Sequence, residues 1–220
     1  MKFTRRAMVA AAATAPFMAS AHAQQPSVPD WLSSHSAMDA WDAPARPAER
    51  LLNAGMEPEP GSTRVSVRDW LGGRPTVLAV WATWCPPCLV EKESEAQLSQ
   101  RLQAAGSSAQ IKALLAYDRA SLTEARQRLQ SLNAGALETG RALESAEQAL
   151  LWTFGLERDR RSMRRTSTVY AQLSTALPFT LLISADGQLL GTMTGRVTDD
   201  DGRAYWSHPS VFEMMQRLGG

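Results

Sequence analysis

Two short apolar runs stand in the middle of the chain, with a longer stretch of helical pattern between them. The runs cover residues 76–82 and 111–117, and the stretch between them covers residues 85–105. A continuous apolar run of this length is typical of a strand buried on both faces of a sheet. The order strand, helix, strand predicts a βαβ unit with parallel strands and a right-handed crossover. A shorter strand is predicted before it, at residues 64–67.

The carboxyl-terminal part predicts an antiparallel addition to this unit. Residues 179–184 and 189–194 have the pattern of strands, and Asp186-Gly187 between them is typical of a tight hairpin turn. Residues 211–218 show the apolar and polar faces of an amphipathic helix.

Residues 121–155 have a helical character, with leucines on two faces. A segment with five arginines follows at residues 158–165 and is typical of a solvated surface loop, with a docking site for an acidic partner as the alternative. We therefore expect an α/β fold in which helices flank a central mixed sheet, with a helical insertion at about residues 119–174.

The first 23 residues have the pattern of an export signal. Lys2, Arg5 and Arg6 form a positive start, an alanine-rich stretch follows, and Ala-His-Ala at residues 21–23 is typical of a signal-peptidase site. The paired arginines also resemble a twin-arginine export signal. We expect cleavage near Ala23 and a mature protein in the periplasm.

Residues 24–62 contain six prolines, a composition that predicts a loosely packed N-terminal arm or linker. A short helix is predicted at residues 47–53, and Trp31 and Trp41 are expected to anchor the arm on the folded part. The remainder, residues 63–220, is expected to form one domain.

Composition narrows the class of protein without naming a function. Apolar residues make up 44% of the chain, which is enough to form a core, and the formal net charge is only +1. This charge gives no support to a nucleic-acid partner, because nucleic-acid binding usually needs a strongly basic surface. The chain has two cysteines, Cys85 and Cys88, so no disulfide can join distant parts of it.

The cysteines form the motif Cys85-Pro86-Pro87-Cys88 at the predicted start of a helix. Backbone N–H groups and the positive end of the helix dipole point at Cys85 and favour its thiolate, which is the nucleophile of disulfide exchange. Cys88 lies one turn further on and can attack a mixed disulfide at Cys85. Pro86 takes a position where its missing N–H is harmless, and both prolines stiffen the turn.

Two other roles for the cysteines are open. A purely structural bridge over so short a loop stabilises the fold little. A zinc site would need Cys85, Cys88, His35 and His208 to converge on one ion. We expect no metal or other cofactor.

Helical periodicity aims one carboxylate toward the sheet. Glu91 falls on the same stripe as the leucines of this helix, beneath the cysteines. A buried carboxylate has a raised pKa and can hold or accept a proton near neutral pH, so we assign Glu91 to the proton of Cys88. The alternatives are that Glu91 reaches the surface or pairs with Lys92; Glu95 also lies near the stripe.

Residues 81–88, Trp-Ala-Thr-Trp-Cys-Pro-Pro-Cys, closely resemble the active-site segment of the TlpA/ResA-like branch of the thioredoxin superfamily. Residues 65–75 resemble the lead-in of that family to its central strand. Residues 177–180, Leu-Pro-Phe-Thr, resemble the loop that bears its cis-proline, and the Asp-Gly at residues 186–187 resembles the hairpin that follows.

The resemblance implies a thioredoxin-like fold and several site residues. Pro178 would follow a cis peptide bond and lie against the cysteines, the backbone of Leu177 would pair with a substrate strand, and Glu91 would be the family's buried glutamate. The residues that it implies as binding substrate or tuning the cysteines are Trp84, Pro86, Pro87, Leu177 and Pro178.

The chain departs from the family pattern close to the motif. The family usually has arginine after the second cysteine, where this chain has Leu89, and Glu93 and Glu95 stand where proline and leucine are common. Because of these changes, the resemblance does not predict whether the helix has the kink of the family or what surface lies beside the cysteines. The segment at residues 119–174 is longer than the usual connection, and either selects partners or adds a helix over the sheet.

We expect an exported thiol–disulfide oxidoreductase that exchanges its cysteine pair with protein cysteines, with reduction as the favoured direction. The resemblance implies cysteine-containing exported proteins as substrates, apocytochrome c among them, and a membrane thiol as electron donor. One alternative is a periplasmic copper or haem chaperone that uses the cysteines as ligands, with His208 or Met214-Met215 in support. Another is a scaffold module in which the pair is vestigial.

Overall fold

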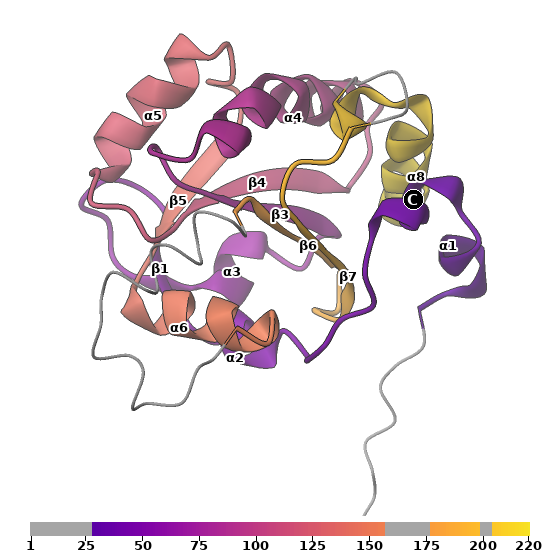
Figure 1. Ribbon diagram of the computed structural model, residues 1–220, viewed down its shortest axis with the longest axis horizontal. Helices are drawn as coiled ribbons and strands as arrows, with labels where there is room; N and C mark the ends of the chain where they lie inside the picture. Colours follow the sequence, from indigo (N-terminus) through magenta and orange to yellow (C-terminus); the bar gives the residue numbers. More distant parts are fainter. Residues whose placement is uncertain (1–27, 157–176, 199–203) are drawn as a thin grey trace, which may run out of the picture.

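The computed structural model describes residues 28–156, 177–198 and 204–220. In this part of the chain a seven-stranded sheet runs through the middle of the molecule, with helices above and below it (Figure 1). The export signal predicted at residues 1–23 and the arginine-rich loop predicted at residues 158–165 lie outside the described residues.

The centre of the sheet is the predicted βαβ unit. β3 (Thr76–Trp81) and β4 (Gln110–Leu115) pair in parallel over their whole length, and every residue of both strands is buried. α4 (Pro86–Ala104) connects them. Both strands carry continuous apolar runs because both faces of the sheet are covered here.

An antiparallel hairpin extends the sheet on the far side of β3. β6 (Phe179–Ile183) pairs antiparallel with β3, and β7 (Leu189–Thr194) pairs antiparallel with β6. The turn uses Gly187, whose φ of 88° lies in the left-handed region that glycine adopts freely. α8 (Pro209–Gly219) ends the chain. The predicted hairpin and terminal helix are confirmed.

The segment after β4 contains one strand that the helical pattern did not predict. α5 (Leu122–Ser131) and α6 (Glu144–Thr153) are helical, but β5 (Glu138–Ala142) lies between them and pairs in parallel with β4. Its sequence has no apolar run, because Thr139 and Gly140 fill two of its three buried positions and Ala142 fills the third. The prediction of helical structure is therefore right for α5 and α6 and wrong for β5.

Six short elements precede the central unit: α1 (Asp30–Ser33), η1 (Ser36–Ala40), α2 (Glu49–Leu52), β1 (Gly55–Glu57), β2 (Val65–Ser66) and α3 (Val67–Leu71). The prediction of a loosely packed arm is wrong for the described part of it. Leu32, Leu51 and Met56 are fully buried, and β1 pairs with β5 in the same sheet. The prolines divide the segment into short pieces, but the apolar side chains between them still cover the edge of the sheet. The predicted short helix is confirmed as α2.

Trp31 and Trp41 anchor this segment, as predicted. The indole N–H of Trp41 donates to the hydroxyl of Tyr205, at 2.7 Å, in η2 (Tyr205–Ser207). Trp31 is partly buried, and the guanidinium of Arg217 lies 4.2 Å from its ring centroid. Both contacts join the N-terminal segment to the carboxyl-terminal end of the chain.

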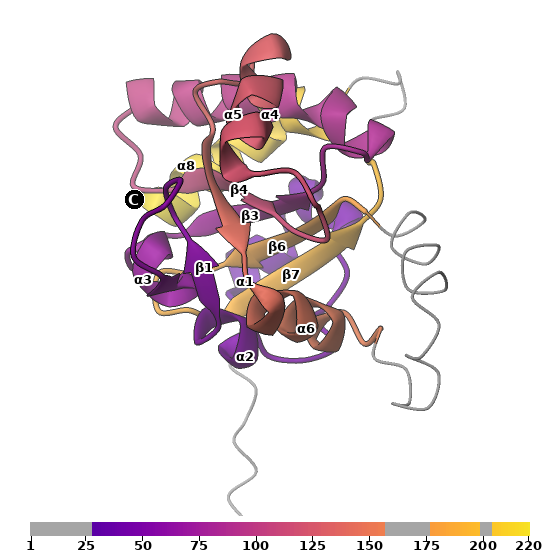
Figure 2. The same ribbon diagram turned by 90° about the vertical axis from the view of Figure 1, so that its left-hand side faces the viewer.

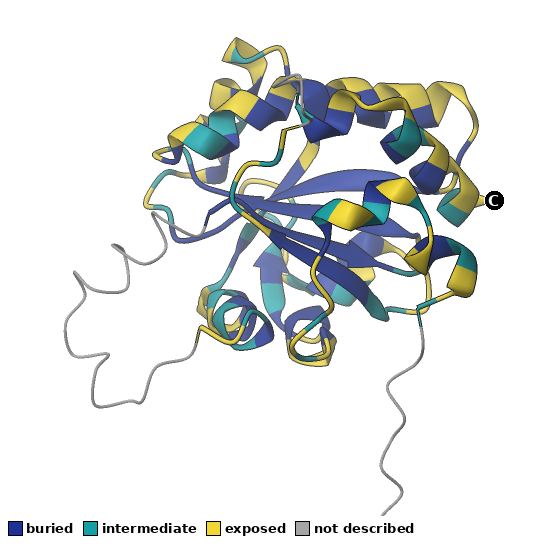
Figure 3. Cartoon of the chain, turned by 45° about the vertical axis from the view of Figure 1, so that its right-hand side comes forward, coloured by how far each residue is buried: buried dark blue, intermediate teal, exposed yellow. Residues whose placement is uncertain are grey.

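The strand order is β2-β1-β5-β4-β3-β6-β7, so the sheet is mixed. α4 and α5 lie on one side of it and α2 and α6 on the other (Figures 1 and 2). The strands are buried almost throughout, whereas the outward faces of the helices are exposed (Figure 3). Among the described residues no helix combines the length and the apolar character needed to cross a membrane.

Candidate active site

The cysteine pair lies where the central strand passes into the long helix. β3 ends at Trp81, three residues lead to Cys85, and α4 begins at Pro86. Cys85 is the N-cap of α4, and its Sγ accepts the backbone N–H of Cys88 at 3.3 Å. The two cysteines form a disulfide, with Cα atoms 5.3 Å apart. When this disulfide is reduced, the same N–H and the helix dipole favour a thiolate at Cys85.

The loop after β4 holds the residues that precede Cys85. The backbone N–H and the hydroxyl of Thr83 both donate to Oδ2 of Asp118, at 2.5 and 2.7 Å. The indole N–H of Trp84 donates to the carbonyl oxygen of Tyr117 at 3.0 Å. Tyr117 is fixed in turn, because its N–H donates to Oε1 of Glu147 and its hydroxyl donates to the carbonyl oxygen of that residue. Parallel strands end at the same edge of a sheet, which brings these two loops together.

We expect Asp118→Ala to loosen the segment that leads to Cys85. The variant loses a carboxylate that accepts three hydrogen bonds, two from Thr83 and one from the N–H of Ala120, so the free energy of unfolding should fall by about 2 kcal/mol. The rate of attack by Cys85 on a small disulfide should fall several-fold in parallel. Urea unfolding and stopped-flow exchange measure the two effects. Asp118→Asn keeps an acceptor oxygen and is the matched control: equal losses in both variants would show that the hydrogen bonds to Thr83 do not position the loop.

Two exposed apolar side chains lie close in sequence to the cysteine motif. Trp84 and Val90 are 38% and 55% exposed, and they are two of the three large apolar side chains exposed in the described part of the chain. Trp84 also lines an open hollow of about 310 Å³ with Tyr117, Asp118 and Arg119. Exposed apolar side chains beside an open hollow are suited to contact with another protein.

The loop of Leu177 and Pro178 reaches the same end of the sheet. The peptide bond between them is cis. Phe179 pairs with Val80 in the antiparallel ladder, so Pro178 lies beside the end of β3 from which the chain runs to Cys85. Both Leu177 and Pro178 are buried, and the carbonyl oxygen of Pro178 accepts the N–H of Gly195 at 2.9 Å.

Glu91 is the buried carboxylate of the site. It is 2% exposed, and its Oε1 accepts the backbone N–H of Val197 at 3.3 Å. Burial and then the charge of Glu95 raise the pKa of Glu91 to about 7, against smaller opposite effects of Lys92 and the Val197 N–H. The indole of Trp206 also favours the charged carboxylate, although its N–H has no hydrogen bond of ordinary geometry. The alternative in which Glu91 reaches the surface is wrong.

Lys92 and Glu95 form an ion pair that the sequence pattern did not predict. Both side chains have no exposed surface, and Nζ of Lys92 lies 2.9 and 2.6 Å from the two carboxylate oxygens of Glu95. Lys92 also lies 5.8 Å from the ring centroid of Trp81 at the end of β3. Lys92 therefore pairs with Glu95, and the alternative in which it pairs with Glu91 is wrong.

The histidines and methionines that metal-binding alternatives would use have other positions. Nδ1 of His35 accepts the N–H of Ala37 and caps η1, and Nδ1 of His208 accepts the N–H of Ser210 and caps α8. Met214 and Met215 are fully buried in the core. Within the described ranges no three His, Cys, Asp or Glu residues come together as a metal site. The four side chains of the zinc alternative therefore do not converge.

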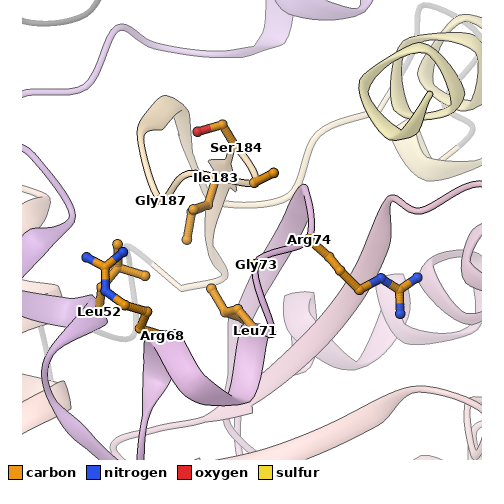
Figure 4. A pocket seen from close by; sticks show the side chains of 9 residues that line it. Leu52, Arg68, Leu71, Gly73, Arg74, Ile183, Ser184 and Gly187 are labelled. Atoms are coloured by element: carbon orange, nitrogen blue, oxygen red, sulfur yellow. The ribbon is translucent and has the colours of Figure 1, made fainter.

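A second hollow lies at the opposite end of β3, between α3 and the hairpin turn (Figure 4). At about 20 Å³ it has room for one water molecule. Its two arginines already have partners: Arg68 pairs with Glu49 at 2.8 Å, and Nε of Arg74 donates to the carbonyl oxygen of Ser108 at 2.7 Å. Of these two hollows, the one at the cysteine end of the sheet is therefore the better candidate for a functional site.

No protein-family model matches the chain, and no curated protein matches it. A comparison with solved structures finds chains that are similar to part of this structure. A secreted thiol-disulfide isomerase from Corynebacterium glutamicum is 16% identical, with a TM-score of 0.46 over 80% of this chain and 83% of that chain. A thiol:disulfide interchange protein of the thioredoxin family from Chlorobium tepidum is 17% identical, with a TM-score of 0.48 over 81% of this chain and 100% of that chain. A secreted disulfide oxidoreductase from Mycobacterium tuberculosis is 16% identical, with a TM-score of 0.42 over 74% of this chain and 96% of that chain.

The topology itself identifies the fold. A parallel β3-α4-β4 unit is extended by the antiparallel β6-β7 hairpin and followed by the terminal helix α8. A cysteine pair begins α4, and a cis-proline precedes β6 at the same end of the sheet. The chain therefore has a thioredoxin-like fold, a mixed sheet flanked by helices.

Proposed function

We propose that this protein is an exported thiol–disulfide oxidoreductase that exchanges its Cys85–Cys88 dithiol or disulfide with the cysteines of other proteins. The observation that carries the proposal is the disulfide at the start of α4, with Cys85 as the N-cap. A cysteine at this position gains the thiolate character that disulfide exchange needs, and a second cysteine one turn away can complete the reaction.

The reaction has two displacements. The thiolate of Cys85 attacks one sulfur of a substrate disulfide, forms a mixed disulfide, and releases the other substrate sulfur as a thiolate. Cys88 then gives its proton to the carboxylate of Glu91 and attacks Sγ of Cys85. This second step releases the remaining substrate sulfur and forms the Cys85–Cys88 disulfide. Two electrons pass from the protein to the substrate, and the reverse sequence oxidises a substrate dithiol.

The surface around Cys85 supports a protein substrate. Trp84 and Val90 offer exposed apolar contact, and Pro86 and Pro87 hold the turn between the cysteines. The backbone of Leu177 is the proposed pairing edge for an extended substrate segment, in the mode by which a strand adds to existing structure.

Reduction is the direction we favour, with cysteine-containing exported proteins, apocytochrome c among them, as substrates. A reductase needs its dithiol restored, so the proposal includes a membrane thiol as electron donor. The site of action is the periplasm, with residues 1–23 as the export signal. These assignments rest on the family resemblance of the motif and on the signal pattern of the sequence.

The first experiment is a redox titration of the mature chain in graded thiol–disulfide buffers, with alkylation to trap free thiols. A potential near that of thioredoxin, about −270 mV, would support a reductase. A value nearer −120 mV would reverse the direction and make the protein an oxidant. Absence of any reversible couple would overturn the proposal and favour the metal-chaperone alternative, which a copper titration of the reduced protein would then test.

A further inference from the structure

The helix that carries the cysteines buries three ionisable side chains within the two turns that follow Cys88. Glu91, Lys92 and Glu95 are each at most 2% exposed. Burial of a single charged group normally costs several kcal/mol, and replacement of a buried ion pair by apolar residues is often neutral or stabilising. The resemblance places leucine where this chain has Glu95, so an apolar alternative fits this type of helix. The ion pair is therefore an unusual feature that fold stability does not explain.

The position of the pair connects it to the redox site. Lys92 is one helical turn after Cys88, and Glu95 is one turn after Glu91, so the four side chains lie along neighbouring rows of α4. Nζ of Lys92 is held by both oxygens of Glu95 and lies near Trp81, at the end of the strand that leads to Cys85. The pair is thus fixed in place within one turn of both Cys88 and Glu91.

We propose that the Lys92–Glu95 ion pair is a positioning element of the redox site, which sets the balance of charge around Glu91 and Cys88 without touching either cysteine. The proposal rests on the proposed function and deepens it. The carboxylate of Glu95 lies one turn from Glu91 and disfavours a negative charge on Glu91. The ammonium group of Lys92 favours that charge. The two residues therefore act on the same carboxylate in opposite directions.

The surroundings of Glu91 contain few other charges. From its own helix come Lys92 and Glu95, from the segment after β7 comes the backbone N–H of Val197, and from η2 comes the uncharged indole of Trp206. The uncharged ring of Trp81 in β3 faces Nζ of Lys92 rather than Glu91. Arg196 is exposed, and residues 199–203 lie outside the described residues. These last groups are unchanged in every variant below, so comparison between variants isolates the ion pair.

The test follows the second displacement alone. The reduced mature protein receives one equivalent of an aromatic disulfide that releases a coloured thiolate at each step. The first thiolate reports attack by Cys85, and the second reports attack by Cys88 within the mixed disulfide. The rate of the second release is measured from pH 5 to 9, and its midpoint reports the group that takes the proton of Cys88.

Opposite shifts are expected from the two ends of the pair. Lys92→Met should move the midpoint up by about one pH unit, and Glu95→Gln should move it down by about one unit. Effects of this size are expected because the charges lie roughly one turn apart in a partly shielded interior. The charge-swapped variant, Lys92→Glu with Glu95→Lys, keeps a buried pair of opposite charges and should still move the midpoint down, because the cation then lies one turn from Glu91. Glu93→Gln, an exposed neighbour on the same helix, is the matched control and should leave the midpoint unchanged.

The outcomes separate a positioning role from a structural one. Three results would each overturn the proposal. The midpoint could shift in one direction for all variants of the pair, it could stay unchanged in all of them, or the charge-swapped variant could restore the original midpoint. If the single variants do not fold, the swapped variant decides; if no variant of the pair folds while Glu93→Gln does, the pair serves the fold alone and the proposal is overturned. Absence of the first release in the unchanged protein would instead overturn the proposed function.

Discussion

Cys85→Ser is expected to abolish disulfide exchange, and Cys88→Ser is expected to stop it halfway. A serine hydroxyl does not ionise near neutral pH, so the N–H groups at the start of α4 have no anion to stabilise at position 85. The rate of attack on a disulfide should fall by at least about 1,000-fold, which corresponds to about 4 kcal/mol in the activation free energy. In Cys88→Ser the thiolate of Cys85 remains, but the displacement that releases the substrate is lost.

The measurement is the capture of mixed disulfides. Cys88→Ser should accumulate a covalent complex with cysteine-containing exported proteins, visible on non-reducing gels and dissolved by a thiol. Cys85→Ser should capture far less, since Cys88 lies inside α4 and lacks the N-cap position that favours a thiolate at Cys85. The double variant is the control for thiol-independent association. Equal capture by both single variants would show that Cys85 is not the attacking residue.

The central part of the fold is predictable because its pattern is unambiguous. β3 and β4 are buried on both faces and carry continuous apolar runs, and the hairpin of β6 and β7 has a marked turn. β1 and β5 escape prediction because their pairing comes from neighbouring strands rather than from their own side chains. Gly140 and Thr139 carry little strand signal alone, yet both are buried once β4 and β1 flank them.

The candidate site likewise has a part that the sequence predicts and a part that it does not. The cysteine motif and the inward direction of Glu91 are local features of one helix, and a period of 3.6 residues is enough to find them. The support of Thr83 and Trp84 by the loop of Tyr117 and Asp118 is a contact between two strand ends. The only signal for it in the sequence is a polar residue directly after a buried strand. The burial of Lys92 had no signal at all, because a lysine beside a glutamate on a helix is usually solvated.

Glu91→Gln is expected to slow the reaction near neutral pH. With the pKa of Glu91 raised to about 7 by burial and by Glu95, its carboxylate becomes available as a base for Cys88 as the pH rises through that value. Glutamine cannot take the proton, so Cys88 must ionise without a neighbouring base, and an ordinary cysteine thiol has a pKa of about 8.5. The rate of the second displacement at pH 7 should fall roughly 30-fold, the factor that 1.5 pH units represent. Attack by Cys85 should change little.

Glu91→Gln should also stabilise the fold at alkaline pH. A slower but more stable variant would show that the loss of rate does not come from a loss of fold stability. In the unfolded chain Glu91 loses its proton near its ordinary pKa of 4.5, whereas the folded protein keeps it to about 7. Between these values the folded state binds more protons, so its stability falls as the pH rises. From pH 4 to 8 the unchanged protein should lose up to about 3 kcal/mol relative to Glu91→Gln, a difference that urea unfolding at both pH values measures. Glu93→Gln should show neither effect. A variant that is both slower and less stable at pH 8 would mean that Glu91 supports the packing of α4, and its assignment to the proton of Cys88 would be wrong.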